Sequence, residues 1–176
     1  MKLHLETDRL LLRPFSLEDA EAMFYGWAND EAVTKYLTWN AHENIDATRE
    51  ILTLWVEQYE KPERINFAIV EKQSGELIGG IDVCGYIDGV PVLGYCLARK
   101  HWNKGYMTEA CQKVLGYLFS IGHTLVKIDA LVENIGSNAV IQKCGGVLQC
   151  CEEEFFSAKN KTMLINRYVV KNCAKR

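Results

Sequence analysis

The stretch from Arg99 to Ala110 has the residue types and the spacing to hold a phosphate group. It joins a predicted strand to a predicted helix, so the first N–H groups of that helix lack intrahelical partners and point into the junction. Gly105 allows a bulky anion to approach the backbone closely, and Asn103 or Lys104 can supply a further donor. A pyrophosphate fits this junction, although an ordinary loop with a glycine at a helix start explains the spacing equally well.

Signatures for other nucleotides and for metals are missing. No Gly-x-Gly-x-x-Gly follows a predicted strand and no Gly-x-x-x-x-Gly-Lys-Ser/Thr occurs, which disfavours NAD and ATP. The seven cysteines form no Cys-x-x-Cys pair and have no histidine at metal-ligand spacing. We therefore expect reduced thiols and no metal.

The periodicity of apolar residues indicates the elements that must position the junction. Strands are predicted over residues 9–14, 67–71, 77–83, 92–98, 125–132, 147–156 and 162–171. Helices are predicted from a capping box at Ser16 to Trp27, from Asn44 to a stop before Pro62, over residues 105–122, and over residues 138–144. The order is β-αα-βββ-α-β-α-ββ, which predicts a single α+β domain over residues 1–176.

Composition and charge exclude several classes of function. A net charge of −3 and a sequence pI near 5.8 disfavour nucleic-acid binding, which needs a basic surface. No apolar run approaches the ~20 residues that cross a bilayer, so no membrane partner is expected. The start of the chain has no apolar core of a signal peptide, which predicts a cytoplasmic protein.

Three separated motifs carry a resemblance to a known family. Gly94-Tyr95 and, after four intervening residues, Lys-x-Trp-Asn-Lys-Gly-Tyr-Met-Thr-Glu-Ala at 100–110 resemble the coenzyme A loop of the GNAT family of N-acetyltransferases. Asn134-x-x-Ser137 with Lys-Cys-Gly-Gly at 143–146, and Thr-Asp-Arg-Leu-Leu-Leu-Arg-Pro at 7–14, resemble pieces of its ribosomal-protein alanine N-acetyltransferase branch. The resemblance spans nearly the whole chain. It implies the acyl-CoA N-acyltransferase fold, a mixed, mostly antiparallel twisted sheet with flanking helices.

The resemblance also implies acetyl-CoA as cosubstrate and assigns residues to it. The backbone of Leu97 and Ala98 would pair with the pantetheine arm, and Asn134 would hydrogen-bond the arm where two strands splay apart. The pyrophosphate would be held by Asn103, Lys104, Gly105, Tyr106, Met107 and Thr108.

Three positions depart from the family pattern. Asn103 stands where Gly is usual, Met107 where Gly or Ala is usual, and Gly146 where an aromatic residue is usual. A bulky Met107 could crowd the pyrophosphate, but the family's contacts there are mostly backbone N–H groups. We still expect acetyl-CoA to bind.

Ser137 is the candidate catalytic residue. By resemblance, it would lie near the thioester sulfur and donate a proton to the departing thiolate. The competing interpretation is purely structural, because a serine directly before a short helix starting at Asn138 is a good N-cap.

The chemistry of direct transfer favours an α-amine as acceptor. An α-amine with a pKa of about 7.8 is about one-seventh neutral at pH 7, whereas a lysine at about 10.4 is neutral about once in 2,500 molecules. No strong general base is evident, since Asp82 and Glu133 are simply carboxylates on or near predicted strands. By resemblance, the segment between residues 25 and 60 would cover the acceptor side, and Tyr36, Trp39 and Glu43 are candidates to line it. The predicted acceptor is a protein N-terminus.

Other functions stay open from the sequence. The same donor chemistry could serve a small cationic amine, such as a polyamine or an aminoglycoside, in which case the acceptor cleft should be acidic. A non-catalytic CoA-binding protein and an interaction domain without a ligand are the alternatives from other classes. A homodimer is also left open.

Overall fold

One mixed sheet forms the centre of the molecule. The structure is a computed structural model that describes residues 3–61 and 64–172. Eight strands lie in the order β1-β2-β3-β4-β5-β6-β8-β7. Their bounds are β1 Leu5–Glu6, β2 Leu10–Arg13, β3 Asn66–Glu71, β4 Leu77–Ile87, β5 Val90–Leu97, β6 Leu125–Leu131, β7 Val147–Phe156 and β8 Lys161–Lys171. All neighbours pair antiparallel except β5 and β6, which confirms the predicted α+β class.

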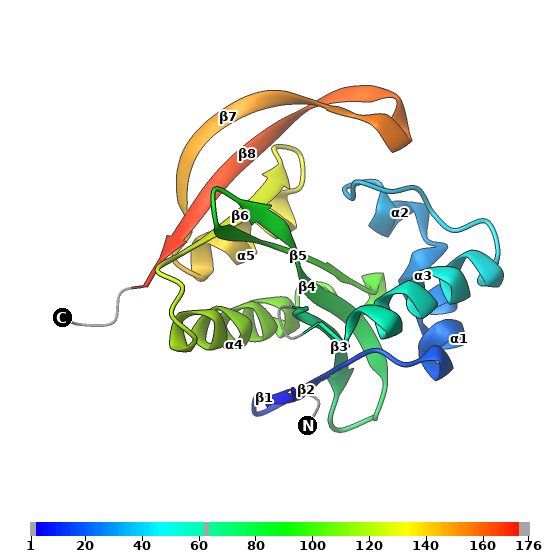
Figure 1. Cartoon of the computed structure of the whole chain (residues 1–176). Helices are drawn as coiled ribbons and strands as arrows, with labels where there is room; N and C mark the ends of the chain where they lie inside the picture. Colours follow the sequence, from blue (N-terminus) through cyan, green and yellow to red (C-terminus); the bar gives the residue numbers. More distant parts are fainter. Residues whose placement is uncertain (1–2, 62–63, 173–176) are drawn as a thin grey trace.

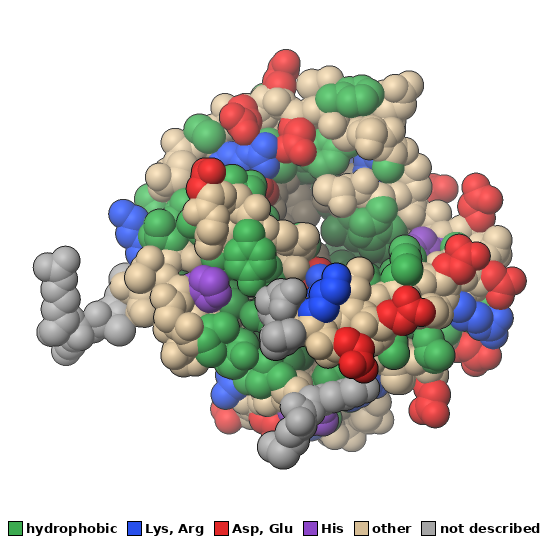
Figure 2. Space-filling view, in the orientation of Figure 1, with side chains coloured by type: hydrophobic (Ala, Val, Ile, Leu, Met, Phe, Trp, Pro, Cys, Tyr) green, Lys and Arg blue, Asp and Glu red, His purple; other side chains and the backbone are tan. Residues whose placement is uncertain are grey.

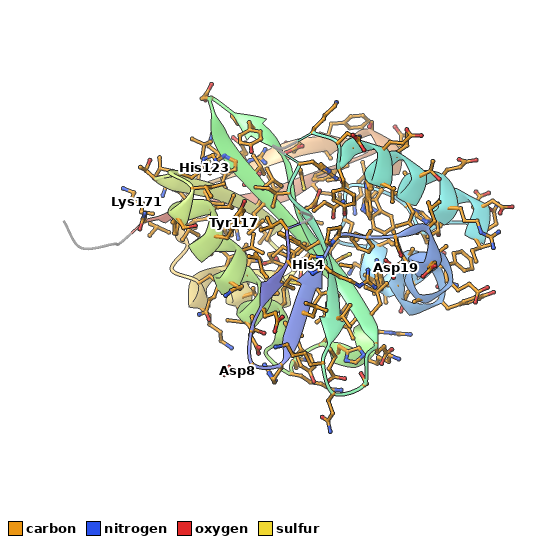
Figure 3. The ribbon with its side chains drawn as sticks, turned by 60° about the horizontal axis from the view of Figure 1, so that its bottom comes forward. His4, Asp8, Asp19, Tyr117, His123 and Lys171 are labelled. Atoms are coloured by element: carbon orange, nitrogen blue, oxygen red, sulfur yellow. The ribbon has the colours of Figure 1, made fainter. Side chains whose placement is uncertain are left out.

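Helices cover both faces of this sheet. Figure 1 shows α4 (Tyr106–Ser120) and α5 (Ile135–Lys143) on one side, and α1 (Ala20–Met23), α2 (Glu31–Thr34) and α3 (Ile45–Gln58) on the other. Figure 3 shows the same division, with Tyr117 of α4 and Asp19 at the start of α1 far apart. Two hydrophobic clusters fill the layers, one under α4 and one under α1 and α3. No helix in the described residues is long and apolar enough to cross a membrane.

Helix α4 forms where the sequence predicts it. Gly105 precedes it with φ 80°, a left-handed conformation that glycine adopts without strain. Its apolar side chains recur at helical spacing and are buried against the sheet: Met107, Ala110, Cys111, Val114, Leu115 and Leu118. This burial anchors the helix, and with it the position of the junction that precedes it.

The predicted turns also form. Asp88 and Gly89 both have positive φ, at 54° and 77°, as the tight turn between β4 and β5 requires. Gly75, at φ 72°, turns the chain between β3 and β4. The β3–β4–β5 meander that the sequence predicts is therefore confirmed.

Strands β5 and β6 separate after a short contact. Their parallel pairing consists of Val92 opposite Lys127 and Leu93 opposite Ile128. Beyond Leu93, β5 continues to pair with β4 as far as Leu97. Residues 94–97 of β5 are therefore paired with β4 on one edge, and their other edge, toward β6, faces a gap.

The region before β3 differs from the prediction. The helix expected from Ser16 to Trp27 is broken into a 3₁₀ turn (Leu17–Asp19), α1 and a π-helical turn (Phe24–Ala28). Strand β1 and helix α2 were not predicted, because two and four residues are too few for a periodic signal. The capping box is confirmed, since the Ser16 N–H donates to the Asp19 carboxylate at 2.8 Å. The predicted stop at Pro62 lies outside the described residues.

The start of α5 corrects the prediction for Ser137. The helix begins at Ile135 and not at Asn138, and its N-cap is Asn134, whose Oδ1 accepts the Ser137 N–H at 3.1 Å. An asparagine is at least as good an N-cap as serine, so the earlier start is favoured. Ser137 consequently lies inside the first turn, and the N-cap interpretation of this residue is wrong.

A substitution at Gly79 of β4 can test how tightly β4 and β5 are packed. A Cβ on Gly79 would lie 2.4 Å from the backbone oxygen of Cys96, so Gly79→Ala must displace β5. We expect a loss of about 1–3 kcal/mol in the free energy of unfolding, measured by urea denaturation. Gly85→Ala on the same strand meets nothing within 4 Å and should lose no stability. Equal stability of the two variants would contradict this account of the packing.

Candidate active site

A cleft opens where β5 and β6 separate. It has a volume of about 570 Å³, within the ordinary range for small-molecule sites. Its walls come from α2, the end of β5, the start of α4 and the first turns of α5. Figure 2 shows one face of the molecule hollowed below the β7–β8 hairpin, with hydrophobic side chains around the opening. The predicted residues that line the cleft are Tyr36, Leu97, Asn103, Gly105, Tyr106, Met107, Thr108, Asn134 and Ser137.

Six consecutive backbone amides gather at the start of α4. In the described part of the chain, the N–H groups of residues 103–108 donate no hydrogen bond to any other group. Free amides in a row, reinforced by the positive end of the helix dipole, form a concave site for an anion. The geometry therefore fits the pyrophosphate that the sequence predicts at this junction.

Two of the departures from the family pattern have a structural explanation. Asn103 has φ 59°, and asparagine tolerates this left-handed region better than other non-glycine residues. The Met107 side chain is buried in the cluster between α4 and the sheet, with 6% of its surface exposed. It points away from the free amides and does not crowd them.

Arg9 braces the loop from the turn that follows β1. Its guanidinium donates to the Lys104 carbonyl at 3.0 Å, pairs with Glu109 at 2.6 Å and lies 4.4 Å from the centre of the Tyr106 ring. The neighbouring Asp8 is labelled in Figure 3. Burial alone would raise the pKa of Glu109, but hydrogen bonds from Thr7 and Arg9 outweigh it and lower the pKa. The segment 7–9 thus holds the anion loop in its conformation.

The free edge of β5 presents backbone groups to the cleft. The Ala98 N–H donates to the Ile78 carbonyl on β4 at 2.8 Å. Because successive residues of a strand direct their backbone groups to opposite edges, Tyr95 and Leu97 face the gap. The Leu97 carbonyl is occupied by the Trp102 indole N–H at 2.7 Å, which leaves the Leu97 N–H for a ligand. A molecule with amide groups can pair along such an edge as another strand would.

Two hydroxyl groups meet across the cleft. The Tyr95 hydroxyl from β5 lies 3.0 Å from Ser137 Oγ on α5. Burial raises the pKa of Tyr95 far above its usual range, so the phenol stays protonated. Both residues line the cleft. The site therefore holds exchangeable protons that are close to the free edge of β5.

The opposite end of the cleft is mostly apolar and only weakly acidic. Val33, Tyr36 and Leu37 line it. Among the residues that line the cleft, Glu133 is the one carboxylate, and it lies 3.7 Å from the Lys35 ammonium. This end can therefore accept a single amine but offers little to a molecule with several positive charges.

Three hydrogen bonds connect the tip of the β7–β8 hairpin to the segment after α2. Lys159 Nζ donates to the carbonyls of Thr34 and Trp39, at 2.9 and 3.2 Å, and Asn40 donates to the Ala158 carbonyl at 2.6 Å. We call these contacts the Lys159 bridge. Burial lowers the pKa of Lys159. The bridge holds the hairpin tip against the segment between Thr34 and Trp39, which carries Tyr36.

Three predicted residues lie away from the cleft walls. The Ala98 N–H donates to the Ile78 carbonyl on β4, and the Ala98 carbonyl accepts the His101 N–H. Lys104 is exposed, and its carbonyl accepts from Arg9. Trp39 is half-buried in the cluster under α1 and α3, with its ring 5.2 Å from that of His42.

Tyr95, His101 and Lys143 are among the residues that line the cleft and for which no role was predicted from the sequence. Tyr95 is two residues before Leu97, and the alternation of a strand could have placed the two on one face. Lys143 belongs to the Lys-Cys-Gly-Gly motif at 143–146, which implied no role for it. No signal pointed to His101, because the walls that carry these residues meet only in the folded chain.

Comparison with known proteins identifies the family. The acetyltransferase (GNAT) domain matches residues 9–147. This chain belongs to the GNAT acetyltransferase family. It is therefore an acetyl-transferring enzyme, and its cleft is the candidate active site of a GNAT acetyltransferase.

Individual proteins resemble this chain in sequence or in fold. The uncharacterized N-acetyltransferase YoaA of Bacillus subtilis is 32% identical over 144 residues, 80% of this chain and 81% of its own. A structure of RimL, a ribosomal L7/L12 α-N-protein acetyltransferase in complex with coenzyme A, has a TM-score of 0.83 at 17% identity and covers 96% and 98% of the two chains. A ribosomal-protein-S5-alanine acetyltransferase from Vibrio fischeri has a TM-score of 0.82 at 15% identity, with 99% of each chain covered. These likenesses confirm the predicted fold.

The brace between segment 7–9 and the anion loop can be tested through Glu109. Glu109→Gln removes the charge that pairs with Arg9, and we expect about 1 kcal/mol lower stability and about 5-fold weaker binding of coenzyme A. Since the pKa of Glu109 lies below 4.5 in the folded chain, this extra stability is present above pH 4.5 and is lost as the pH falls through the folded-state value.

Urea unfolding from neutral to acidic pH and calorimetric titration with coenzyme A measure these effects. Asp46→Asn removes an exposed ion pair with Arg49 on α3 and serves as the control with unchanged binding. Unchanged coenzyme A affinity in Glu109→Gln would show that the brace does not shape the loop.

Proposed function

We propose that this enzyme transfers the acetyl group of acetyl-CoA to the α-amine of a protein N-terminus by direct attack. One observation carries the proposal: the free edge of β5, the start of α4 with its free amides and the Ser137 hydroxyl line a single cleft. The resemblance of the fold to RimL and to the S5-alanine acetyltransferase supports the choice of acceptor.

The cleft fits the parts of acetyl-CoA. The amides of residues 103–108 are suited to the pyrophosphate, and the Leu97 N–H to an amide oxygen of the pantetheine arm. The Asn134 side-chain N–H₂ has no partner among the described residues, since its Oδ1 alone is used to cap α5. It can therefore donate to the same arm.

Bound acetyl-CoA supplies an acetyl group activated as a thioester. The chain contributes backbone N–H donors on the free edge of β5, which can stabilise negative charge that develops on a carbonyl oxygen. Ser137 holds a proton at Oγ on the wall of the same cleft and can deliver it to a leaving sulfur. No covalent step is needed, so Cys96, which lines the cleft with its thiol pKa raised to about 12 by burial, has no nucleophilic role.

The electrostatics of the cleft support an α-amine as acceptor. A polyamine or an aminoglycoside carries several positive charges and calls for several carboxylates. Glu133 is the one carboxylate on the walls of the cleft, and Lys35 lies beside it. A mostly apolar, weakly acidic end suits a chain end with one amine, which also needs little help to lose its proton.

The donor site is tested by a pair of glycine variants. Gly105→Ala and Gly89→Ala place a Cβ at nearly the same positive φ, 80° and 77°, and should lose similar stability, about 1 kcal/mol. A Cβ on Gly105 would lie 3.4 Å from the Arg9 guanidinium that braces the anion loop, whereas a Cβ on Gly89 meets nothing within 4 Å. Calorimetric titration with acetyl-CoA should show binding weakened about 10-fold or more in Gly105→Ala and unchanged in Gly89→Ala. Absence of binding by the unmodified protein would refute the donor assignment.

The acceptor is tested with peptides of matched sequence. A peptide with a free N-terminus and no lysine should be acetylated, whereas its N-terminally blocked counterpart with an internal lysine should react poorly. The ratio kcat/KM should rise with pH and level off above about pH 8, as the α-amine becomes neutral. Preference for spermidine over every peptide would replace this acceptor with a small cationic amine.

A further inference from the structure

Tyr95 and Ser137 form a contact that no role in substrate binding explains. Tyr95 comes from β5 and Ser137 from α5, 42 residues apart in the sequence, and their hydroxyl oxygens are 3.0 Å apart. The Tyr95 hydroxyl also lies 3.4 Å from the Ser137 backbone carbonyl. Among the described residues, Ser137 supplies every hydrogen-bond partner of this phenol.

The proton inventory allows two arrangements of this pair. A tyrosine and a serine hydroxyl each hold one proton. In the first arrangement Tyr95 donates to Ser137 Oγ, and the serine proton is free to point into the cleft. In the second, Ser137 Oγ donates to the Tyr95 hydroxyl. The phenol proton can then be donated only to the Ser137 backbone carbonyl at 3.4 Å, which is a weak hydrogen bond. The distances favour the first arrangement, because the Tyr95 proton then lies on the 3.0 Å contact and not on the 3.4 Å one.

Both residues are held in place by the fold. Tyr95 packs against the buried cluster under α4, between Leu93 and Leu97 on the same face of β5. The Ser137 backbone is held by its N–H bond to Asn134 at 3.1 Å. Asn134 therefore sets the position of the serine, and the remaining freedom is rotation of its hydroxyl.

We propose that Tyr95 is a positioning residue that, by donating to Ser137 Oγ, directs the serine proton at the leaving sulfur. The inference rests on the proposed function, in which Ser137 protonates that sulfur. The amine nitrogen forms a bond to the carbonyl carbon of the thioester; as the C–S bond breaks, its electron pair stays on sulfur and the sulfur takes the Ser137 proton. The attacking amine releases its proton to solvent water, and Ser137 recovers one from solvent. Tyr95 keeps its own proton throughout.

The test compares four variants with the same acceptor peptide. Ser137→Ala should lower kcat about 100-fold, and Tyr95→Phe about 10-fold, since misdirection costs less than loss of the donor. The double variant should be no slower than Ser137→Ala alone, because the two residues act as a unit. The Kd of coenzyme A should stay the same in all of them, which a disturbed core would not allow.

Tyr168→Phe is the matched control. The Tyr168 hydroxyl donates at 2.7 Å to the Asn138 side chain, one residue beyond Ser137, and its ring belongs to the same buried cluster as Tyr95. Its removal should leave kcat unchanged. A loss of kcat in Tyr168→Phe equal to that in Tyr95→Phe would assign the effect to packing and overturn the inference.

The outcomes separate the two proposals. If Ser137→Ala keeps full kcat, the catalytic role in the proposed function fails, and with it the role of Tyr95. If Ser137→Ala is slow while Tyr95→Phe is normal, or if the two losses multiply, only the positioning role is overturned.

A second measurement covers the case in which Tyr95→Phe does not fold. Site-specific difluorotyrosine at position 95 keeps the ring and lowers the pKa of the phenol. The groups around this phenol are Cys111, Cys144, Tyr168 and Ser137. We expect a new fall in kcat at alkaline pH that disappears when Ser137→Ala is added. An unchanged pH profile would overturn the inference.

Discussion

The separation of β5 from β6 is the constraint on which the rest of this structure depends. Two residue pairs, at Val92 and Leu93, join the strands before they part. Unpaired backbone N–H and C=O groups in the middle of a sheet are costly unless water or a ligand satisfies them. The molecule can keep this gap because β4 continues to hold β5 through Leu97 on its other side. The gap is thus part of the fold, and the strand that borders it is held in place by β4.

Every other part of the site is arranged around that gap. Helix α4 is the crossover between the two separating strands, so its N-terminal amides necessarily open next to the free edge of β5. Helix α5 follows β6 directly and places Asn134 and Ser137 on the other wall. The donor site therefore follows from the connection of three elements, and its chemistry comes from backbone groups more than from side chains.

Contacts between distant segments hold the loop and the acceptor end. Arg9, from the start of the chain, contacts Lys104, Tyr106 and Glu109 and so links the first strands to the anion loop. At the other end, Lys159 connects the tip of β7–β8 to the segment that follows α2. These polar contacts are made by single side chains across large sequence distances. They explain why residues without a direct chemical role contribute to the shape of the site.

The sequence by itself determined the α+β class, the β3–β5 meander, the long helices and the anion loop, because each depends on local periodicity, turn residues or glycine spacing. Gly105, Asn134 and Ser137 could be singled out from motifs. Tertiary structure alone decided that Met107 is buried away from the amides, that Ala98 and Trp39 lie off the cleft, and that Tyr95 meets Ser137. Such contacts join strands and helices far apart in the chain, and the direction of a side chain depends on which partner its strand or helix packs against.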